Sequence, residues 1–141
     1  MSPGISGEYA LEESPVILVV EDDPLVQSLL EVALSEAGFE IEITSSGEEA
    51  VTSLSTSDKK YRALVTDINL IGRLDGWEVA RAAREIEPDF PIIYMSGKDA
   101  AYWASKGVPN SIMLAKPFAP AQLVTGVSQL LNAGSPPTAP A

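Results

Sequence analysis

Short apolar runs alternate with helix-forming stretches along most of this chain, and this alternation restricts its fold more than any other feature. Five such runs are predicted as strands: Val16–Val20, Phe39–Thr44, Ala63–Thr66, Ile92–Met95 and Ser111–Leu114. A continuous apolar run is typical of a parallel strand that is buried on both faces. Phe39–Thr44 instead alternates apolar and acidic residues, so we expect it nearer an edge of the sheet. The pattern predicts an α/β fold, in which helices cover a parallel sheet.

The segments between these runs carry signals for five helices. Asp23 is expected to cap a first helix that begins at Pro24 and ends at Gly38. Ser46 and Glu49 have the spacing of a capping box for a second helix. The remaining helices are predicted from near Gly76 to just before Pro88, over Ala100–Lys106, and after Pro117. In the first helix, the apolar face that the pattern predicts consists of Leu25, Leu29, Val32 and Ala33.

The length of 141 residues suits one domain, which we place at residues 15–132. Residues 1–14 are expected to form a flexible N-terminal arm, and residues 133–141 a flexible proline-rich tail. The start of the chain lacks the basic and apolar regions of a signal peptide, and no apolar run approaches the roughly 20 residues that cross a bilayer. We therefore expect a cytoplasmic protein with no membrane partner.

Composition narrows the chemistry that the chain can perform. It has no cysteine and no histidine, which excludes thiolate metal sites, disulfides and the commonest general base. Its net charge of −11, from 9 basic and 20 acidic residues, argues against binding to a nucleic acid backbone. A metal site or a catalytic site must therefore use carboxylates, hydroxyls, lysine or the backbone.

Polar residues follow four of the predicted strands. Glu21, Asp22 and Asp23 follow the first strand, Asp67 the third, Ser96 the fourth and Lys116 the fifth. In open α/β sheets, ligands bind outside the carboxyl ends of the strands. If the first, third, fourth and fifth strands are neighbours, these side chains meet at one edge of the sheet.

Each of these residues also has a simple structural interpretation. Asp23 before a proline is most simply a helix cap, and Glu21 and Asp22 could be solvated loop acids. Asp67 and Ser96 could be turn residues, and Lys116 an ordinary surface lysine. The combination is more informative than its members, because one chemistry requires all of them.

That chemistry is phosphoryl transfer to a carboxylate. A hard divalent cation, Mg²⁺ above all, binds one or two carboxylates and completes its shell with water. Glu21, Asp22 and Asp67 would supply carboxylates for it, and the cation would offset their mutual repulsion. A carboxylate can also act as a nucleophile and carry a phosphoryl group. Lys116 and the hydroxyl of Ser96 would then bind the added oxygens.

These residues lie in segments that closely resemble the response-regulator receiver domain of two-component signalling. The segments are "VVEDDP", "LVTDINL", "DGWE", "IIYMSG" and "LAKPF", and the resemblance spans about Pro15 to Leu131. It implies a single-domain receiver similar to the chemotaxis regulators. It also implies a doubly wound, flavodoxin-like sheet of five parallel strands in the order 2-1-3-4-5, with five helices.

The resemblance further implies a role for each site residue. Asp67 matches the phosphoacceptor, and Ser96 and Lys116 match the switch hydroxyl and the phosphate-contacting lysine. Glu21 and Asp22 match the acidic pair that holds Mg²⁺, with Asp22 the more direct ligand. Asn69 matches the position whose backbone carbonyl completes the metal shell. Lys116–Pro117 matches a peptide bond that is usually cis in this family.

The sequence departs from the family pattern at several positions. The loop from Asp67 to Asp75 is one residue longer than usual and has Gly72 but no proline. Met113 replaces the usual aromatic residue, so either Tyr94, Tyr102 or Trp103 takes over its switching role or no aromatic residue does; Met113 itself suits plain strand packing. Two residues near Ser96 also bear on switching. Gly97 is expected to loosen its loop, and Lys98 is either a solvated lysine or a residue that tunes hydrolysis of the acyl phosphate.

The resemblance implies a phosphoacceptor switch rather than an enzyme, with self-catalysed phosphoryl transfer and slow autodephosphorylation. A histidine kinase or a phosphotransfer protein would phosphorylate Asp67. The change would alter a binding surface around Ile92–Met95, Ala100–Lys106 and Ser111–Leu114 for an unknown downstream protein. One alternative is a degenerate receiver that acts as a phosphorylation-independent docking module. Another is a Mg²⁺-dependent phosphohydrolase, which the Asn at position 69 disfavours because such enzymes have a second acid there.

Overall fold

The computed structural model describes residues 15–56 and 60–133. The strands are β2 (Val16–Val20), β3 (Glu40–Thr44), β4 (Tyr61–Asp67), β5 (Ile92–Ser96) and β6 (Ile112–Ala115). The α-helices are α2 (Pro24–Glu36), α3 (Gly47–Thr56), α4 (Gly76–Ile86), α5 (Trp103–Lys106) and α6 (Pro120–Ala133), and a 3-10 turn, η2 (Ala100–Tyr102), precedes α5. The arm predicted at residues 1–14 and all but Ala133 of the predicted tail lie outside the described residues.

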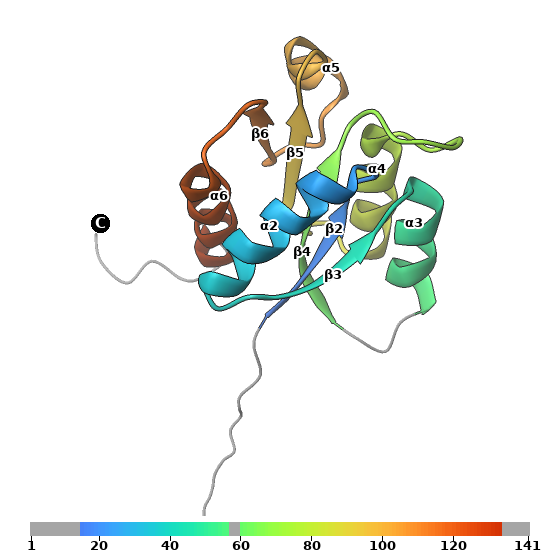
Figure 1. Cartoon of the computed structure of the whole chain (residues 1–141). Coiled ribbons are helices and arrows are strands. Elements are labelled where there is room, and N and C mark those ends of the chain that lie inside the picture. The colour runs from blue at the N-terminus through green and yellow to red at the C-terminus, as the bar shows by residue number, and fades with distance from the viewer. Residues whose placement is uncertain (1–14, 57–59, 134–141) are drawn as a thin grey trace, which may run out of the picture.

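The five strands form one parallel sheet in the order β3-β2-β4-β5-β6 (Figure 1). In chain order this is 2-1-3-4-5, so the predicted topology is confirmed. Helices α2 and α6 pack together on one face of the sheet, and α3 and α4 pack together on the other. The carboxyl ends of β2, β4, β5 and β6 therefore share one edge of the molecule.

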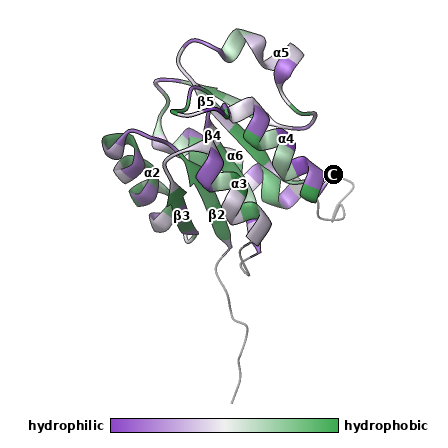
Figure 2. Cartoon of the chain, turned by 90° about the vertical axis from the view of Figure 1, so that its right-hand side faces the viewer, coloured by the Kyte–Doolittle hydropathy of each residue, from purple (hydrophilic) through white to green (hydrophobic). Residues whose placement is uncertain are grey.

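Each face of the sheet has its own apolar core. In Figure 2 the strands are coloured mostly green, for hydrophobic residues. Leu18, Leu64 and Tyr94 point toward α3 and α4, whereas Val19, Val65 and Met95 point toward α2 and α6. All six are fully buried. Side chains that alternate between two buried faces explain why β2, β4 and β5 are continuously apolar. The edge strand β3 exposes Glu40 and keeps acidic residues, as its alternating sequence predicted.

Helix α2 begins and ends where the sequence predicted. The N–H of Leu25 donates to Asp23 Oδ1 at 2.9 Å, so Asp23 is the N-cap. Gly38 follows the helix with a φ of +97°, a conformation that glycine adopts at little cost.

The predicted apolar face of α2 was wrong. Leu25, Leu29 and Val32 are exposed, with exposed fractions of 77%, 65% and 55%, and Ala33 is half-buried. The helix has a second apolar stripe, Val26, Leu30 and Leu34, and this stripe packs with Leu123 and Val127 of α6. Both stripes have helical spacing, so periodicity alone did not distinguish them.

Substituting one leucine from each stripe of α2 tests this assignment. We expect Leu34→Ala to lower the free energy of unfolding by about 2–5 kcal/mol, because it opens a cavity in the core. Leu29→Ala removes the same atoms from an exposed position and should change it by less than about 0.5 kcal/mol. Urea denaturation of the two variants measures the difference, and equal losses would contradict the observed orientation of the helix.

The capping box predicted for α3 is present only in part. The N–H of Glu49 donates to Ser46 Oγ at 3.2 Å, as expected. The Glu49 carboxylate, however, accepts the N–H of Ser45 at 2.9 Å rather than that of Ser46. A complete capping box joins Asp75 and Glu78 at the start of α4, with both bonds at 2.9 Å. This box fixes the helix that follows the loop after Asp67.

None of the helices in residues 15–56 and 60–133 combines the length and apolar character needed to cross a bilayer.

Candidate functional site

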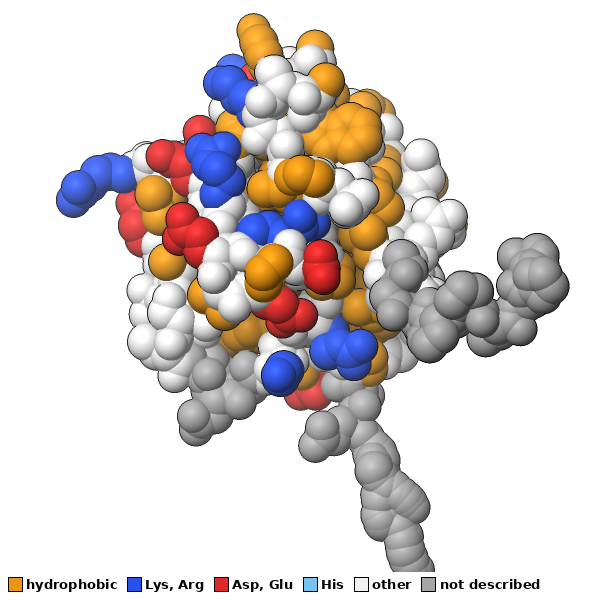
Figure 3. Space-filling model, turned by 180° about the vertical axis from the view of Figure 1, so that it is seen from behind, with side chains coloured by type: hydrophobic (Ala, Val, Ile, Leu, Met, Phe, Trp, Pro, Cys, Tyr) orange, Lys and Arg blue, Asp and Glu red, His pale blue; other side chains and the backbone are white. Residues whose placement is uncertain are grey.

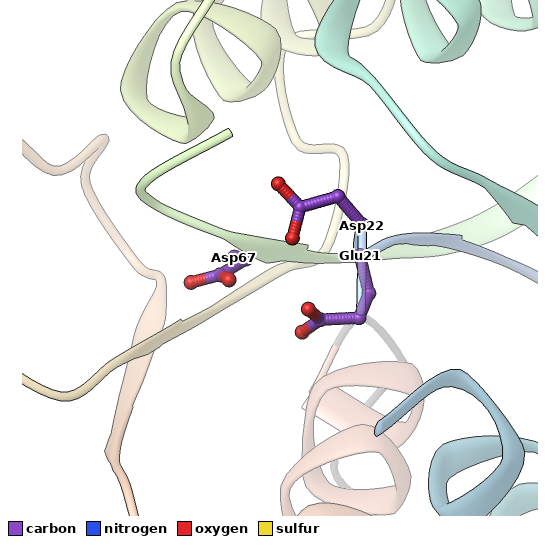
Figure 4. Close-up of side chains that lie close together, drawn as sticks. All are labelled: Glu21, Asp22 and Asp67. Carbon is purple, nitrogen blue, oxygen red and sulfur yellow. The ribbon is translucent and has the colours of Figure 1, made fainter. Parts of the chain in front are cut away.

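Three carboxylates converge at the carboxyl edge of the sheet. Oxygen atoms of Glu21, Asp22 and Asp67 lie within 4.8 Å of one another. Figure 4 shows the three side chains extending from the ends of β2 and β4 toward a common space. These strands are neighbours in register, with Val20 paired to Thr66, so the residues that follow them meet. The structure thus brings together the acidic residues that the sequence singled out for a metal.

Lys116 completes this cluster. Its Nζ lies 3.3 Å from Asp67 Oδ2 and 3.4 Å from Glu21 Oε1, forming ion pairs with both. The N–H of Lys116 donates to the carbonyl of Ser96 at 2.8 Å, which ties the end of β6 to β5. Lys116 precedes Pro117 through a cis peptide bond, as the resemblance implied.

The three consecutive acids after β2 face different surroundings. Glu21 is 1% exposed and uses both oxygens, since Oε2 accepts the N–H of Asp23 at 3.1 Å and Oε1 accepts from Lys116. Asp22 is half-buried, and its Oδ2 accepts the N–H of Ile71 at 3.2 Å. Asp23 is exposed and caps α2. Asp22 is therefore the less encumbered of the two acids assigned to the metal.

The charges of this pocket perturb one another. Burial raises the pKa of Asp67 above its ordinary value, and the negative charge of Asp22 adds to this effect, although Lys116 and the N–H of Ile68 oppose it. Burial likewise raises the pKa of Glu21, against the opposing bonds from Asp23 and Lys116. Burial alone would lower the pKa of Lys116, but the charges of Asp67 and Glu21 outweigh it and raise that pKa. The pocket thus holds more negative charge than its one lysine offsets.

This excess of carboxylate oxygens fits a hard divalent cation. Mg²⁺ binds through one or two carboxylates and keeps several waters, which this site allows because Asp22 is half-buried beside the buried Asp67. Burial is the main cause of the raised pKa of Asp67 and of Glu21, and the single charge of Lys116 does not offset it. A bound cation would supply further positive charge. The roles of Asp22, Asp67 and the Asn69 carbonyl as its ligands stay predictions.

Ser96 lies at the same edge but bonds to its own loop. It is 1% exposed, and its Oγ accepts the N–H groups of Lys98 at 3.2 Å and Asp99 at 2.7 Å. Asp67 pairs in register with Met95, the residue before Ser96, so the two strand ends are adjacent. The hydroxyl still has its proton to donate, because both contacts use it as an acceptor.

The unusual loop after Asp67 is held by acidic side chains. Glu48 Oε2 accepts the N–H of Arg73 at 2.7 Å, and this bond lowers the pKa of Glu48. Gly72 has a φ of +105°, and an added Cβ there would lie 2.8 Å from Glu48 Oε1. The loop that lacks the usual proline is therefore anchored by Glu48 and by Asp22, at Ile71.

Gly76 is required where this loop meets the end of β4. A Cβ on Gly76 would lie 2.2 Å from the backbone oxygen of Asp67 and 2.9 Å from Ile68 Cα. We expect Gly76→Ala to cost about 3 kcal/mol in free energy of unfolding, since backbone must move to admit the methyl group. Gly97→Ala is the matched control, because its Cβ would meet only Lys116 Cβ at 4.0 Å. Chemical denaturation separates the two, and a neutral Gly76→Ala would contradict this packing.

The structure also places the candidate aromatic residues. Tyr94 is fully buried on β5, packs against Trp77 with tilted rings whose centroids are 4.7 Å apart, and accepts the N–H of Val108 at 3.1 Å. Trp103 is 39% exposed and donates from Nε1 to Ser111 Oγ at 2.9 Å, and Tyr102 is 52% exposed. Met113 packs against the core on the α3 and α4 side. Which of these aromatic residues acts in switching stays a prediction.

Sequence reasoning missed Asp99. Its Oδ2 accepts from Asn69 Nδ2 at 2.6 Å, which joins the loop after β4 to the loop after β5. Ser96 and Asp99 have the spacing of a serine followed three residues later by an acid, which signals a contact of Asp99 with Ser96 but not with Asn69.

Comparisons with known proteins agree with this geometry. Residues 17–128 match the family model described as the response regulator receiver domain. A crystal structure of a response regulator receiver protein from Sinorhizobium medicae WSM419 is 49% identical, with a TM-score of 0.83, and the match covers 86% of this chain and 97% of that chain.

A second structure is the receiver domain of the sensor histidine kinase PA1611 from Pseudomonas aeruginosa PAO1, which holds a magnesium ion in its active site cleft. It is 28% identical, with a TM-score of 0.74, over 85% of this chain and 99% of that chain. Among curated proteins, the response regulator MprA of Mycobacterium sp. (strain KMS) is 33% identical over 126 residues, covering 88% of this chain and 54% of MprA. This chain thus spans about half the length of that relative.

Proposed function

The chain belongs to the response regulator receiver domain family, and from that premise we propose that it is a phosphoacceptor switch in which Asp67 receives the phosphoryl group. Receiver domains are signalling modules that histidine kinases phosphorylate. The observation that carries the proposal is the position of Lys116 Nζ, 3.3 Å from Asp67 Oδ2 in a cluster with two further carboxylates. The donor in our proposal is a histidine kinase or a phosphotransfer protein.

In the proposed transfer, an oxygen of Asp67 attacks the phosphorus of a phosphohistidine. The P–O bond to Asp67 forms as the P–N bond to the imidazole breaks, and the imidazole takes a proton from solvent. Lys116 orients the Asp67 carboxylate and stays to pair with the new phosphoryl oxygens. Ser96 donates its hydroxyl proton to one of these oxygens. A Mg²⁺ ion held by Asp22 and Asp67 would neutralise part of the charge on the transferring group.

Asp22 and Asp67 are the side chains that we assign to the metal, with Glu21 behind them and the Asn69 carbonyl completing the protein ligands. The magnesium ion in the Pseudomonas aeruginosa receiver supports this assignment, because that protein has the same fold. Glu21 is already bonded to Lys116 and to the N–H of Asp23, so its main effect is on charge.

The output of the switch in our proposal is a change in the surface formed by β5, η2, α5 and β6. This surface includes Ser96, the last residue of β5, directly before the connection to η2 and α5. An unidentified downstream protein would read it. The same proposal takes residues 15–132 as the receiver domain, with 1–14 and 133–141 as an arm and a tail, in the cytoplasm.

Incubation with a small phosphodonor such as acetyl phosphate and Mg²⁺ tests the proposal. We expect about one phosphoryl group per chain by intact mass spectrometry, with loss of the adduct when a chelator replaces Mg²⁺. No adduct would favour the phosphorylation-independent docking module. Repeated turnover of varied phosphate esters would favour a hydrolase. The intact set of Asp67, Ser96 and Lys116 favours the switch over both.

A further inference from the structure

One hydrogen bond joins the loop after Asp67 to the loop after Ser96. Asn69 Nδ2 donates to Asp99 Oδ2 at 2.6 Å, a short bond to a charged acceptor. Asn69 is exposed and Asp99 is half-buried, so the bond lies at the surface of the carboxyl edge. The proposed phosphoryl transfer uses neither side chain.

Asp99 also holds the switch hydroxyl through its backbone. Its N–H donates to Ser96 Oγ at 2.7 Å, a shorter contact than the 3.2 Å from the N–H of Lys98. If Ser96 turned to a phosphoryl group on Asp67, it would lose or weaken both contacts. Asp99 therefore bonds to Asn69 through its side chain and to Ser96 through its backbone N–H.

The segment that follows Asp99 is weakly attached to the rest of the protein. Neither η2 nor α5 has a buried residue. Gly97 offers little packing, since a Cβ there would find only Lys116 Cβ at 4.0 Å. Nearby anchors are the bonds from Trp103 to Ser111 and from Val108 to Tyr94. Tyr102 and Trp103 in this segment are 52% and 39% exposed, and Figure 3 shows some hydrophobic side chains among polar ones at the top of the molecule.

We propose that Asp99 is a positioning residue that holds residues 97–106 in the unphosphorylated arrangement by linking Asn69 to the loop of Ser96. This inference rests on the proposed function, because phosphorylation of Asp67 is the event that would release the segment. A phosphoryl group brings about two negative charges to the same edge of the sheet and repels the Asp99 carboxylate. It also draws the Ser96 hydroxyl away from the N–H of Asp99. Both effects release the segment.

Hydrogen exchange of peptides covering residues 97–106 tests the inference, with β2 and β4 as internal references. We expect Asp99→Ala without phosphate to exchange about fivefold faster than the wild-type chain in this segment. Asp99→Asn keeps an acceptor for Asn69 and should exchange like the wild-type chain. Asp89→Ala is the matched control, because Asp89 is exposed in the turn between α4 and β5. Phosphorylation should bring the wild-type segment to at least the level of Asp99→Ala, and it should speed exchange less in that variant, where only the contact with Ser96 is left to lose.

Equal exchange of unphosphorylated wild type and Asp99→Ala would overturn the inference. If Asp99→Ala also speeds exchange in β2 and β4, the test uses the wild-type chain and Asp99→Asn instead. Unchanged exchange of the wild-type segment after stoichiometric phosphorylation then refutes the inference. Equal acceleration in both proteins also refutes it, because the proposed repulsion requires the charge of Asp99. If the wild-type chain accepts no phosphoryl group, the proposed function fails, whereas the unphosphorylated comparison still tests the positioning role.

Discussion

Asp67→Asn leaves no phosphoryl group on the chain after incubation with a phosphodonor and Mg²⁺, if Asp67 is the nucleophile. The substitution keeps the shape of the side chain and removes the attacking carboxylate oxygen. Intact mass spectrometry should therefore show complete loss of the adduct. Asp23→Asn makes the same chemical change one residue beyond the cluster, and asparagine also caps helices well, so that variant should be phosphorylated like the wild-type chain. Retention of the adduct in Asp67→Asn would contradict the assignment.

The same variant should be more stable than the wild-type chain at neutral pH. Burial raises the pKa of Asp67 above the ordinary value of 3.8. The folded chain then binds this proton more tightly than the unfolded chain, so wild-type stability falls as pH rises from 3.8 through the raised pKa. Asp67→Asn removes this contribution. Because the pKa of Glu21 is also raised, the stability of the variant should still fall as pH rises, but less steeply. Thermal unfolding from acid to neutral pH measures both slopes, and a steeper fall in Asp67→Asn would contradict the sign.

Lys116→Ala should slow phosphorylation of Asp67 by about 10²-fold, comparable to the loss of one donor to a developing charge. The substitution removes the ammonium group that lies 3.3 Å from Asp67 and 3.4 Å from Glu21. It leaves two largely buried carboxylates without their common partner, and the chain should also become less stable at neutral pH. Added Mg²⁺ should restore more stability to this variant than to the wild-type chain, because it replaces the missing positive charge.

Lys106→Ala is the matched control for Lys116→Ala. It changes the net charge equally, but Lys106 is exposed on α5 and lies over the ring of Tyr102, with Nζ 5.3 Å from the ring centroid. We expect its phosphorylation rate to stay within about twofold of the wild-type rate. Equal slowing in both lysine variants would show that general charge, rather than the position of Lys116, governs the reaction.

The strands and the acid cluster could be predicted because local sequence determines them. Val16–Val20 is a continuous apolar run, and because Glu21 and Asp22 follow it directly, they lie at the carboxyl edge of the sheet for any order of the strands. The neighbouring order of β2 and β4 was not determined locally, and the resemblance to a family supplied it. With that order, convergence of Asp22, Asp67 and Lys116 follows from geometry.

The features that were missed depend on contacts between distant segments. Helix α2 has two apolar stripes, and its buried stripe is selected by Leu123 and Val127 of α6, far along the chain. Asn69 and Asp99 lie in different loops, so neither side chain signals its partner in the sequence. Glu48 holds Arg73 in the same way, from the first turn of α3. Sequence patterns predict where helices and strands end better than they predict which distant side chains form hydrogen bonds with one another.

The most direct measurement of the central claim is the position of the phosphoryl group in the chain. Wild-type protein would be phosphorylated with a small donor in Mg²⁺, quenched cold in acid, digested and sequenced by tandem mass spectrometry. Our account predicts a single modified residue, Asp67, with no modification when a chelator removes the metal. A phosphoryl group on another residue, or equal modification of Asp67 without Mg²⁺, would contradict a site in which Asp22, Asp67 and Lys116 act around one cation.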